Sequence, residues 1–199
     1  RQGLMRWEGR AWRLFGTESG LLHRRLAFLA EAADHAIWVG YGDVRGVSRM
    51  DWRGGAPSVT HYGESSVLGS NDISFLGADR RGYVWVGTEN GVDLFDGRDW
   101  RRFTPDHGLL WPDCVYNSFW IDREGDVYIG TNRGVSTFHA PDRFELPASP
   151  TVFITSFNAS RSFWSEPAVR WRDQPIRLQF AVPSFVNERD IRFRYRLAS

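Results

Sequence analysis

The segment HGLLWPD, which begins at His107, brings together side chains from which a ligand site can be built. Trp111 offers a flat aromatic face, and His107 and Asp113 on either side of it offer hydrogen bonds and charge. His23 takes the place of Trp111 in a similar segment, GLLHRR, near the start of the chain. These four residues are the candidate ligand-binding residues. The alternative is a structural loop in which Trp111 packs on Pro112.

The other reactive side chains predict no catalytic residue, metal site or cofactor. The five histidines lack spacings such as H-x-H or HExxH, and no serine lies in a G-x-S-x-G turn. The segment DREGD, which begins at Asp122, has too few oxygen ligands for a calcium loop, so we expect a hairpin turn. Cys114 is the single cysteine, which excludes an internal disulfide and a cysteine-based zinc cluster.

Composition narrows the class of partner. The 199-residue chain has 25 basic and 24 acidic residues, and its arginines are scattered, so no basic patch for nucleic acid is expected. No apolar run reaches the ~20 residues of a membrane helix, and no signal peptide is visible. Because the chain begins with Arg1 and stops within the strand-like segment RFRYRLAS, we expect it to be an excerpt of a longer polypeptide.

The elements that position the candidate residues belong to an internal repeat. The segment VWVGTENGV at 84–92 recurs as VYIGTNRGV at 127–135 and, less closely, as AIWVGYGDV at 36–44. Turn residues divide each unit into four short, Val- and aromatic-rich strands, and about 40–45 residues with four strands per repeat are typical of a β-propeller. Residues that recur at one place in every unit are expected to pack between blades, not to bind ligand: Trp38, Trp85, Tyr128, Gly40, Gly87 and Gly130.

The repeat also predicts how each blade is laid out. Segments that end at Asp34, Asp79 and Asp122 are expected to be the innermost strands. LAFLAEAAD at 26–34 has a helix-like composition, but its place in the repeat predicts a strand. The long connections that carry His107, Trp111 and Asp113, or His23, then lie together at one end of the propeller, where ligand sites of such folds usually lie.

The repeat resembles the two-component-regulator propeller repeat, D-x-x-G-x-x-W-x-G-T-x-x-G. One unit matches it with Asp79, Gly82, Trp85, Gly87, Thr88 and Gly91, and the next with Asp122, Gly125, Gly130, Thr131 and Gly134, with Tyr128 in the Trp position. The unit around Trp38 departs from the pattern, since it lacks the Asp-x-x-Gly spacing and has Tyr41 in place of Thr. We therefore expect an altered hairpin there.

The tail resembles the three-tyrosine (Y-Y-Y) module, an immunoglobulin-like sandwich that follows such propellers. Its signatures are matched by Phe180, Pro183, Ser184, Phe185, Tyr195, Arg196 and Leu197. The expected fold is thus all-β. Residues 1–145 would form about three and a half propeller repeats with four-stranded blades, and residues 146–199 the N-terminal part of the sandwich. So few repeats cannot close a ring, so exposed blade edges should seek a second copy or a missing segment.

The two resemblances imply the extracytoplasmic, periplasmic sensor region of a bacterial inner-membrane receptor. Such a receptor passes ligand binding to a histidine kinase or diguanylate cyclase inside the cell, so this region itself would not be an enzyme. The expected ligand is an unknown small molecule or oligosaccharide, and the intact, membrane-anchored receptor is expected to be a homodimer. Two alternatives stay open: a protein-docking propeller scaffold and a propeller lyase or hydrolase.

Overall fold

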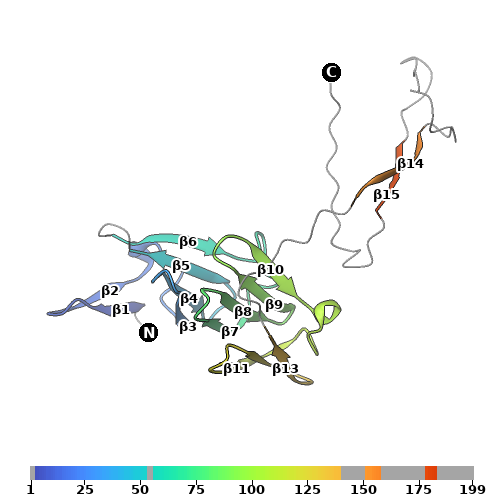
Figure 1. Cartoon of the computed structure of the whole chain (residues 1–199). Coiled ribbons are helices and arrows are strands. Elements are labelled where there is room, and N and C mark those ends of the chain that lie inside the picture. Colours follow the sequence, from blue (N-terminus) through green and yellow to red (C-terminus); the bar gives the residue numbers. More distant parts are fainter. Residues whose placement is uncertain (1–2, 53–55, 140–150, 158–177, 183–199) are drawn as a thin grey trace, which may run out of the picture. The chain divides into compact units, whose positions relative to one another are not determined.

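The protein is described from a computed structural model that covers residues 3–52, 56–139, 151–157 and 178–182. These residues form antiparallel β-strands joined by turns and by two short 3₁₀ helices (Figure 1). The all-β prediction is therefore confirmed. The chain divides into two compact units, residues Arg1–Phe144 and Glu145–Ser199. The assignment of these parts to a propeller and a sandwich domain stays a prediction.

Two complete four-stranded sheets form the centre of the first unit. The first blade consists of β3 (Leu26–Glu31), β4 (Ile37–Tyr41), β5 (Val47–Asp51) and β6 (Ser58–Tyr62). The second blade consists of β7 (Ile73–Ala78), β8 (Val84–Thr88), β9 (Gly91–Phe95) and β10 (Trp100–Phe103). In both, each strand pairs antiparallel with the next along the chain, as the repeat predicts. The segment that begins at Leu26 is a strand despite its composition.

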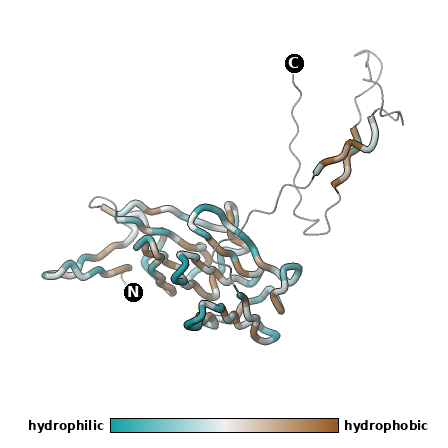
Figure 2. The backbone as a smooth tube through the Cα atoms, in the orientation of Figure 1, coloured by the Kyte–Doolittle hydropathy of each residue, from teal (hydrophilic) through white to brown (hydrophobic). Residues whose placement is uncertain are grey.

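Incomplete sheets flank these two blades. The third blade consists of β11 (Cys114–Ile121), β12 (Val127–Thr131) and β13 (Gly134–Phe138), and a hairpin of β1 (Leu4–Trp7) and β2 (Trp12–Phe15) precedes the first blade. The 3₁₀ helices η1 (Thr17–Ser19) and η2 (Pro105–His107) follow β2 and β10. The sheets follow one another along the chain, an arrangement compatible with the predicted partial propeller, and Figure 2 shows apolar residues concentrated in the strands.

The second unit contains one described antiparallel pair, β14 (Phe153–Phe157) with β15 (Leu178–Ala181). Phe180, the first residue of the predicted Y-Y-Y signature, lies in β15. The other signature residues, from Pro183 to Leu197, lie outside the described residues. The resemblance of the tail to a Y-Y-Y module therefore stays a prediction.

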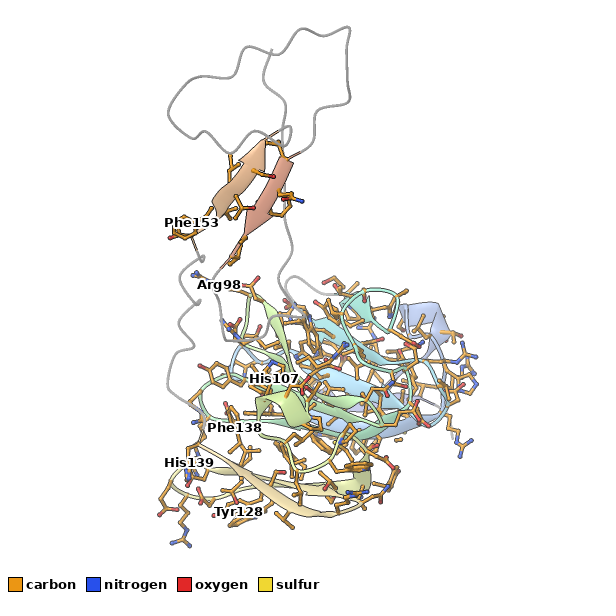
Figure 3. All side chains as sticks on the ribbon, turned by 90° about the vertical axis from the view of Figure 1, so that its right-hand side faces the viewer. Arg98, His107, Tyr128, Phe138, His139 and Phe153 are labelled. Carbon is orange, nitrogen blue, oxygen red and sulfur yellow. The ribbon has the colours of Figure 1, made fainter. Side chains whose placement is uncertain are left out.

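The repeated tryptophans lie between neighbouring blades. Trp38 is fully buried, and its indole lies 5.4 Å from the Phe95 ring and 5.8 Å from the Trp100 ring of the second blade. Trp85, also fully buried, lies 5.4 Å from the Phe138 ring of the third blade. Tyr128 lies on the opposite side of the third blade from Phe138 and is partly exposed (Figure 3).

The repeated glycines leave room for inner-strand side chains of the same blade. A Cβ atom added at Gly87 would lie 2.1 Å from the Phe75 ring, and one at Gly40 would lie 3.0 Å from the Phe28 ring. At Gly130 the nearest atom is the Ser118 hydroxyl oxygen, at 2.5 Å. A side chain at Gly87 would collide with the Phe75 ring, and one at Gly40 or Gly130 would force the facing side chain to move, so glycine is favoured at all three positions.

The structure gives a physical reason for the D-x-x-G-x-x-W spacing. The Asp79 carboxylate accepts hydrogen bonds from the Arg81 and Tyr83 backbone N–H groups at 2.9 and 3.0 Å, which fixes the hairpin turn. It also accepts from the Trp85 indole N–H at 3.3 Å, so a buried polar group is satisfied six residues away. Asp122 does the same in the third blade, accepting from the Tyr128 hydroxyl at 3.3 Å.

The first blade departs from this spacing and loses the contact. Asp34 lies four residues before Trp38 and accepts instead from the Ala36 backbone N–H at 3.1 Å and from Arg49 at 2.5 Å. Within the described residues, the buried indole nitrogen of Trp38 has no hydrogen-bond partner. The altered sequence around Trp38 therefore leaves a buried donor unsatisfied, which costs stability.

Candidate functional site

Each candidate ligand residue lies on a crossover loop, the connection from the last strand of one sheet to the first strand of the next. The described crossover loops span residues 16–25, 63–72 and 104–113. Each meets the turn between the second and third strands of the blade that it enters. We call this contact the latch of that blade. Because crossover loops and these turns lie at the same end of every sheet, the three latches lie at one end of the array.

In each blade, a side chain of the second or third strand accepts a hydrogen bond from a backbone N–H group of the crossover loop. In the third blade, the Leu110 N–H donates to the Ser136 hydroxyl at 2.9 Å. In the second blade, the Gly69 N–H donates to the Asp93 carboxylate at 2.7 Å. In the first blade, the Leu22 N–H donates to the Tyr41 hydroxyl at 3.0 Å. Tyr41, where the repeat otherwise has Thr, thus takes over an anchoring role.

The second crossover loop is also held by an ion pair in which the Asp93 carboxylate is buried and the Arg102 guanidinium is 41% exposed. The Arg102 guanidinium donates to Asp93 at 2.7 Å and to the Val67 carbonyl at 2.8 Å, so it ties the loop to β9. Burial raises the pKa of Asp93, and its hydrogen bonds from Gly69 and Arg102 oppose that shift. This carboxylate is used entirely within the blade and does not face a ligand.

The loop that carries three of the four candidate residues begins with a local cap. The ring Nδ1 of His107 lies 3.0 Å from the Thr104 hydroxyl and accepts from the Thr104 backbone N–H at 3.3 Å. Gly108 follows with φ of 91°, a left-handed conformation that favours glycine. Leu109 is buried and Leu110 is 49% exposed. His107 therefore shapes the start of the loop (Figure 3).

Trp111 and Asp113 meet the turn of the third blade. The Arg133 guanidinium lies 3.7 Å from the centroid of the Trp111 ring, close enough for a cation–π contact. The Asn132 side-chain amide donates to the Asp113 carboxylate, and the Asn132 backbone N–H donates to the Asp113 carbonyl at 3.1 Å. Trp111 is half-buried. The third latch thus offers an aromatic–guanidinium pair beside a carboxylate–amide pair.

His23 lies on the first crossover loop, two blades away from the third latch. Its Nδ1 lies 3.6 Å from the Asp43 carboxylate, which also accepts from Arg45 at 2.6 Å. The Arg45 hydrogen bond is the main reason that the pKa of Asp43 is lowered. The structure therefore brings Trp111 and Asp113 to one latch, places His107 at the start of the same loop, and places His23 at another latch.

Sequence reasoning missed the partners Arg133, Asn132 and Asp43. Each lies in the short turn after the repeated Gly-Thr or Gly-Tyr dipeptide, within the segments TNRG and YGDV. These turn positions differ from one unit to the next. That variation was the signal in the sequence by which the three partners could have been found. It marks the turn as the second half of each latch.

The pair of Ser48 and His61 superficially resembles a nucleophile with its base. The Ser48 hydroxyl lies 2.7 Å from His61 Nδ1 and 2.7 Å from the Tyr41 hydroxyl. Ser48 is fully buried, so a substrate cannot reach it, and the chain of hydrogen bonds serves to anchor Leu22. Across the residues that the structure describes, no group of three or more His, Cys, Asp or Glu side chains could hold a metal ion. In the same residues, no helix is long and apolar enough to cross a membrane.

Comparison with known proteins gives a shared fold. No protein-family model matches this chain, and no curated protein matches its sequence. Among solved structures, the chain is similar to the extracellular domain of BT3049 from B. thetaiotaomicron, a protein assigned as a hybrid two-component system, with a TM-score of 0.59 and 16% identity. It is also similar to PorZ, a surface component of the type-IX secretion system of Porphyromonas gingivalis, with a TM-score of 0.46 and 19% identity.

The two solved structures match different shares of this chain. The match to the BT3049 domain covers 85% of this chain but 25% of that one. The match to PorZ covers 59% of this chain and 18% of that one. This chain therefore spans a quarter or less of the length of either structure, and it shares its β-sheet architecture with part of the BT3049 domain.

Proposed function

We propose that this chain belongs to the extracytoplasmic sensing region of a bacterial two-component receptor. The observation that carries the proposal is the shared fold with the extracellular domain of a hybrid two-component system over 85% of the chain. The resemblance of the repeat and of the tail to the propeller and Y-Y-Y modules of such receptors points the same way. The region itself is proposed to be non-catalytic and periplasmic, within a membrane-anchored, homodimeric parent protein.

The ligand, a small molecule or oligosaccharide, would bind at the end of the propeller that carries the latches. The third latch is the strongest candidate, because Leu110 is exposed beside the Trp111–Arg133 pair and beside Asp113. An indole and a guanidinium in contact present both a stacking surface and hydrogen-bond donors. For a signal to pass, the ligand must bind one arrangement of the receptor more tightly than another.

A thermal-shift screen of the chain against sugars, oligosaccharides and amino acids tests this site. We expect a compound that binds to raise Tm. With Arg133→Ala or Trp111→Ala, the same rise in Tm should require at least ten times more of that compound. Arg123→Ala is the matched control, since Arg123 is an exposed arginine in the turn at the other end of the third blade. If the control weakens binding as much as Arg133→Ala, the third latch is not the site.

The proposed role in signalling has a separate test. The coding sequence that adjoins this chain should specify a transmembrane helix and a kinase or cyclase domain. A secreted product that ends soon after residue 199 would count against a receptor. That result would favour a docking scaffold, a function supported by the exposed tryptophans Trp7 and Trp12 of the β1–β2 hairpin and Trp120 of the third blade.

A further inference from the structure

The third blade has two more residues in its first strand than the other blades have. The change is visible in the spacing between two repeated positions, a buried leucine of the crossover loop and the aromatic residue of the second strand. These positions are 17 residues apart in the first and second blades and 19 apart in the third: Leu21 and Trp38, Leu68 and Trp85, Leu109 and Tyr128. The third unit therefore carries an insertion between two landmarks that all three units share.

Strand pairing places the two extra residues near the start of β11. In the second blade, one residue, Ser74, interrupts the pairing of the first strand with the second. In β11 the interruption lies between Cys114 and Phe119, and the Ser118 side chain lies against a glycine of the second strand, as the Phe75 side chain does in β7. Three residues of β11 thus take the place of one. We call Val115, Tyr116 and Asn117 the β11 bulge.

Local contacts give the β11 bulge a defined conformation. Asn117 has φ of 60°, a left-handed conformation that few residues other than glycine adopt and that asparagine tolerates best. The Ser118 hydroxyl donates to the Val115 carbonyl at 2.7 Å and lies 3.2 Å from the Gly130 carbonyl of β12. Bulges of this kind change the direction in which a strand presents its side chains, and they are common beside functional sites.

The insertion replaces a buried aromatic ring with an exposed one. Phe28 and Phe75, which occupy the position of Ser118 in the first and second blades, are buried. Tyr116 is 62% exposed, and Asn117 beside it is exposed as well. Packing within the third blade does not require a large side chain at the bulge, because the other blades have a single small residue there. The Tyr116 ring is therefore available for another contact.

The β11 bulge lies where the first strands of the three blades converge. The Tyr116 ring centroid is 5.1 Å from that of Phe28, which belongs to β3, two blades earlier in the chain. The first strand of the second blade, β7, contacts both β3 and β11. In a propeller the first strands surround a central channel, and further blades add to the side of the array, not along this axis. The bulge thus faces a side that neighbouring blades leave open to small molecules.

We propose that the β11 bulge binds a sugar ring of a neutral oligosaccharide. The Tyr116 ring stacks on the apolar C–H face of the sugar, and the Asn117 amide, which has both donors and an acceptor, bonds to the hydroxyl groups at its edge. The bulge residues carry no charge, which suits a neutral ligand. Asp113 of the third latch lies two residues before the bulge, so one oligosaccharide can contact both. This inference rests on the proposed function and names the chemistry of its ligand.

Isothermal titration calorimetry of the chain tests the proposal, with cellotetraose, maltotetraose, mannotetraose and xylotetraose as probes. We expect at least one probe to bind, and Tyr116→Ala to raise its Kd at least tenfold. Asn117→Gly should raise Kd about fivefold, as the loss of one hydrogen bond does, while glycine keeps the left-handed backbone. Trp120→Ala is the matched control, because Trp120 is 61% exposed on the same strand outside the bulge. Far-ultraviolet circular dichroism verifies that each variant is folded.

The outcomes separate the β11 bulge from the third latch. Loss of binding in Tyr116→Ala but not in Arg133→Ala would support the bulge and remove the third latch as the site. The reverse result would overturn the bulge and leave the third latch in place. The inference is also overturned if none of the probes binds, or if Trp120→Ala weakens binding as much as Tyr116→Ala. The receptor role itself is decided by the adjoining coding sequence, so it can stand when the bulge fails.

Discussion

The equivalent tryptophans Trp38 and Trp85 allow the energy of one hydrogen bond to be measured within a single chain. Both are fully buried between blades, but the Trp85 indole N–H donates to Asp79 and that of Trp38 has no partner in the described structure. Phenylalanine removes the N–H group at either position and shortens the ring system by a similar amount. We predict that Trp85→Phe destabilises the protein more than Trp38→Phe.

The magnitude follows from the two hydrogen-bond states. Both substitutions leave a similar cavity, so its cost cancels when the two variants are compared. Trp85→Phe also removes a hydrogen bond to a charged acceptor, worth about 1.5 kcal/mol because Asp79 keeps its bonds from the Arg81 and Tyr83 N–H groups. Trp38→Phe removes an unsatisfied donor and recovers about 1 kcal/mol. The free energies of unfolding should therefore differ by about 2–3 kcal/mol.

Urea denaturation followed by circular dichroism gives the free energy of unfolding of both variants. It should be measured at one low protein concentration, at which contacts between chains do not contribute. In an Asp79→Ala background the extra cost of Trp85→Phe should disappear, because the acceptor is absent. Equal costs for the two single variants, or a larger cost for Trp38→Phe, would refute this account of the D-x-x-G-x-x-W spacing.

Three further predictions concern the side chains of Asp93, Cys114 and His61. Asp93→Ala should cost about 1–3 kcal/mol, because it removes the acceptor of the Gly69 N–H and the partner of Arg102; chemical denaturation measures this loss. Burial raises the pKa of Cys114 to about 11, so the folded protein should resist iodoacetamide at pH 8 and react only in denaturant, as mass spectrometry would show. Partial desolvation lowers the pKa of His61 from 6.5, so its contribution to stability is full above pH 6.5 and decreases as pH falls through the folded pKa. The urea midpoint should therefore fall between pH 7.5 and 5.5, and less so in His61→Gln.

The repeat made the strands and their order predictable, because strand patterns and turns recur at fixed intervals along the chain. Even the segment that begins at Leu26, whose composition favours a helix, was assigned correctly from its place in the repeat. The long-range partners were not predictable in the same way. The contact of Trp111 with Arg133 joins a loop to a turn 22 residues later, and only the folded blade brings them together. Whether the Trp38 indole N–H finds an acceptor likewise depends on the direction of the Asp34 side chain. The changed spacing alone does not specify that direction.

In the candidate site, too, the loop was predictable from the sequence and its long-range contacts were not. The sequence pointed to the loop that carries His107, Trp111 and Asp113, because unrepeated residues on a repeated scaffold are free to vary. It treated Trp111 as an exposed anchor and His23 as its counterpart. The structure places both residues against charged side chains of neighbouring turns, Arg133 and Asp43. Whether either binds a ligand stays a prediction.

The complete burial of β8 has a consequence for motion. Every residue of β8 is buried, with sheets on both sides of the second blade, whereas β1, β2 and β13 have exposed residues in most positions. In an array where each blade contacts only its neighbours, opening begins at the ends and moves inward. Amide hydrogens of β8 should therefore exchange with solvent last, and those of the hairpin and of β13 first. Contact at both ends with another blade would remove this gradient, so that slow exchange extends along the whole array.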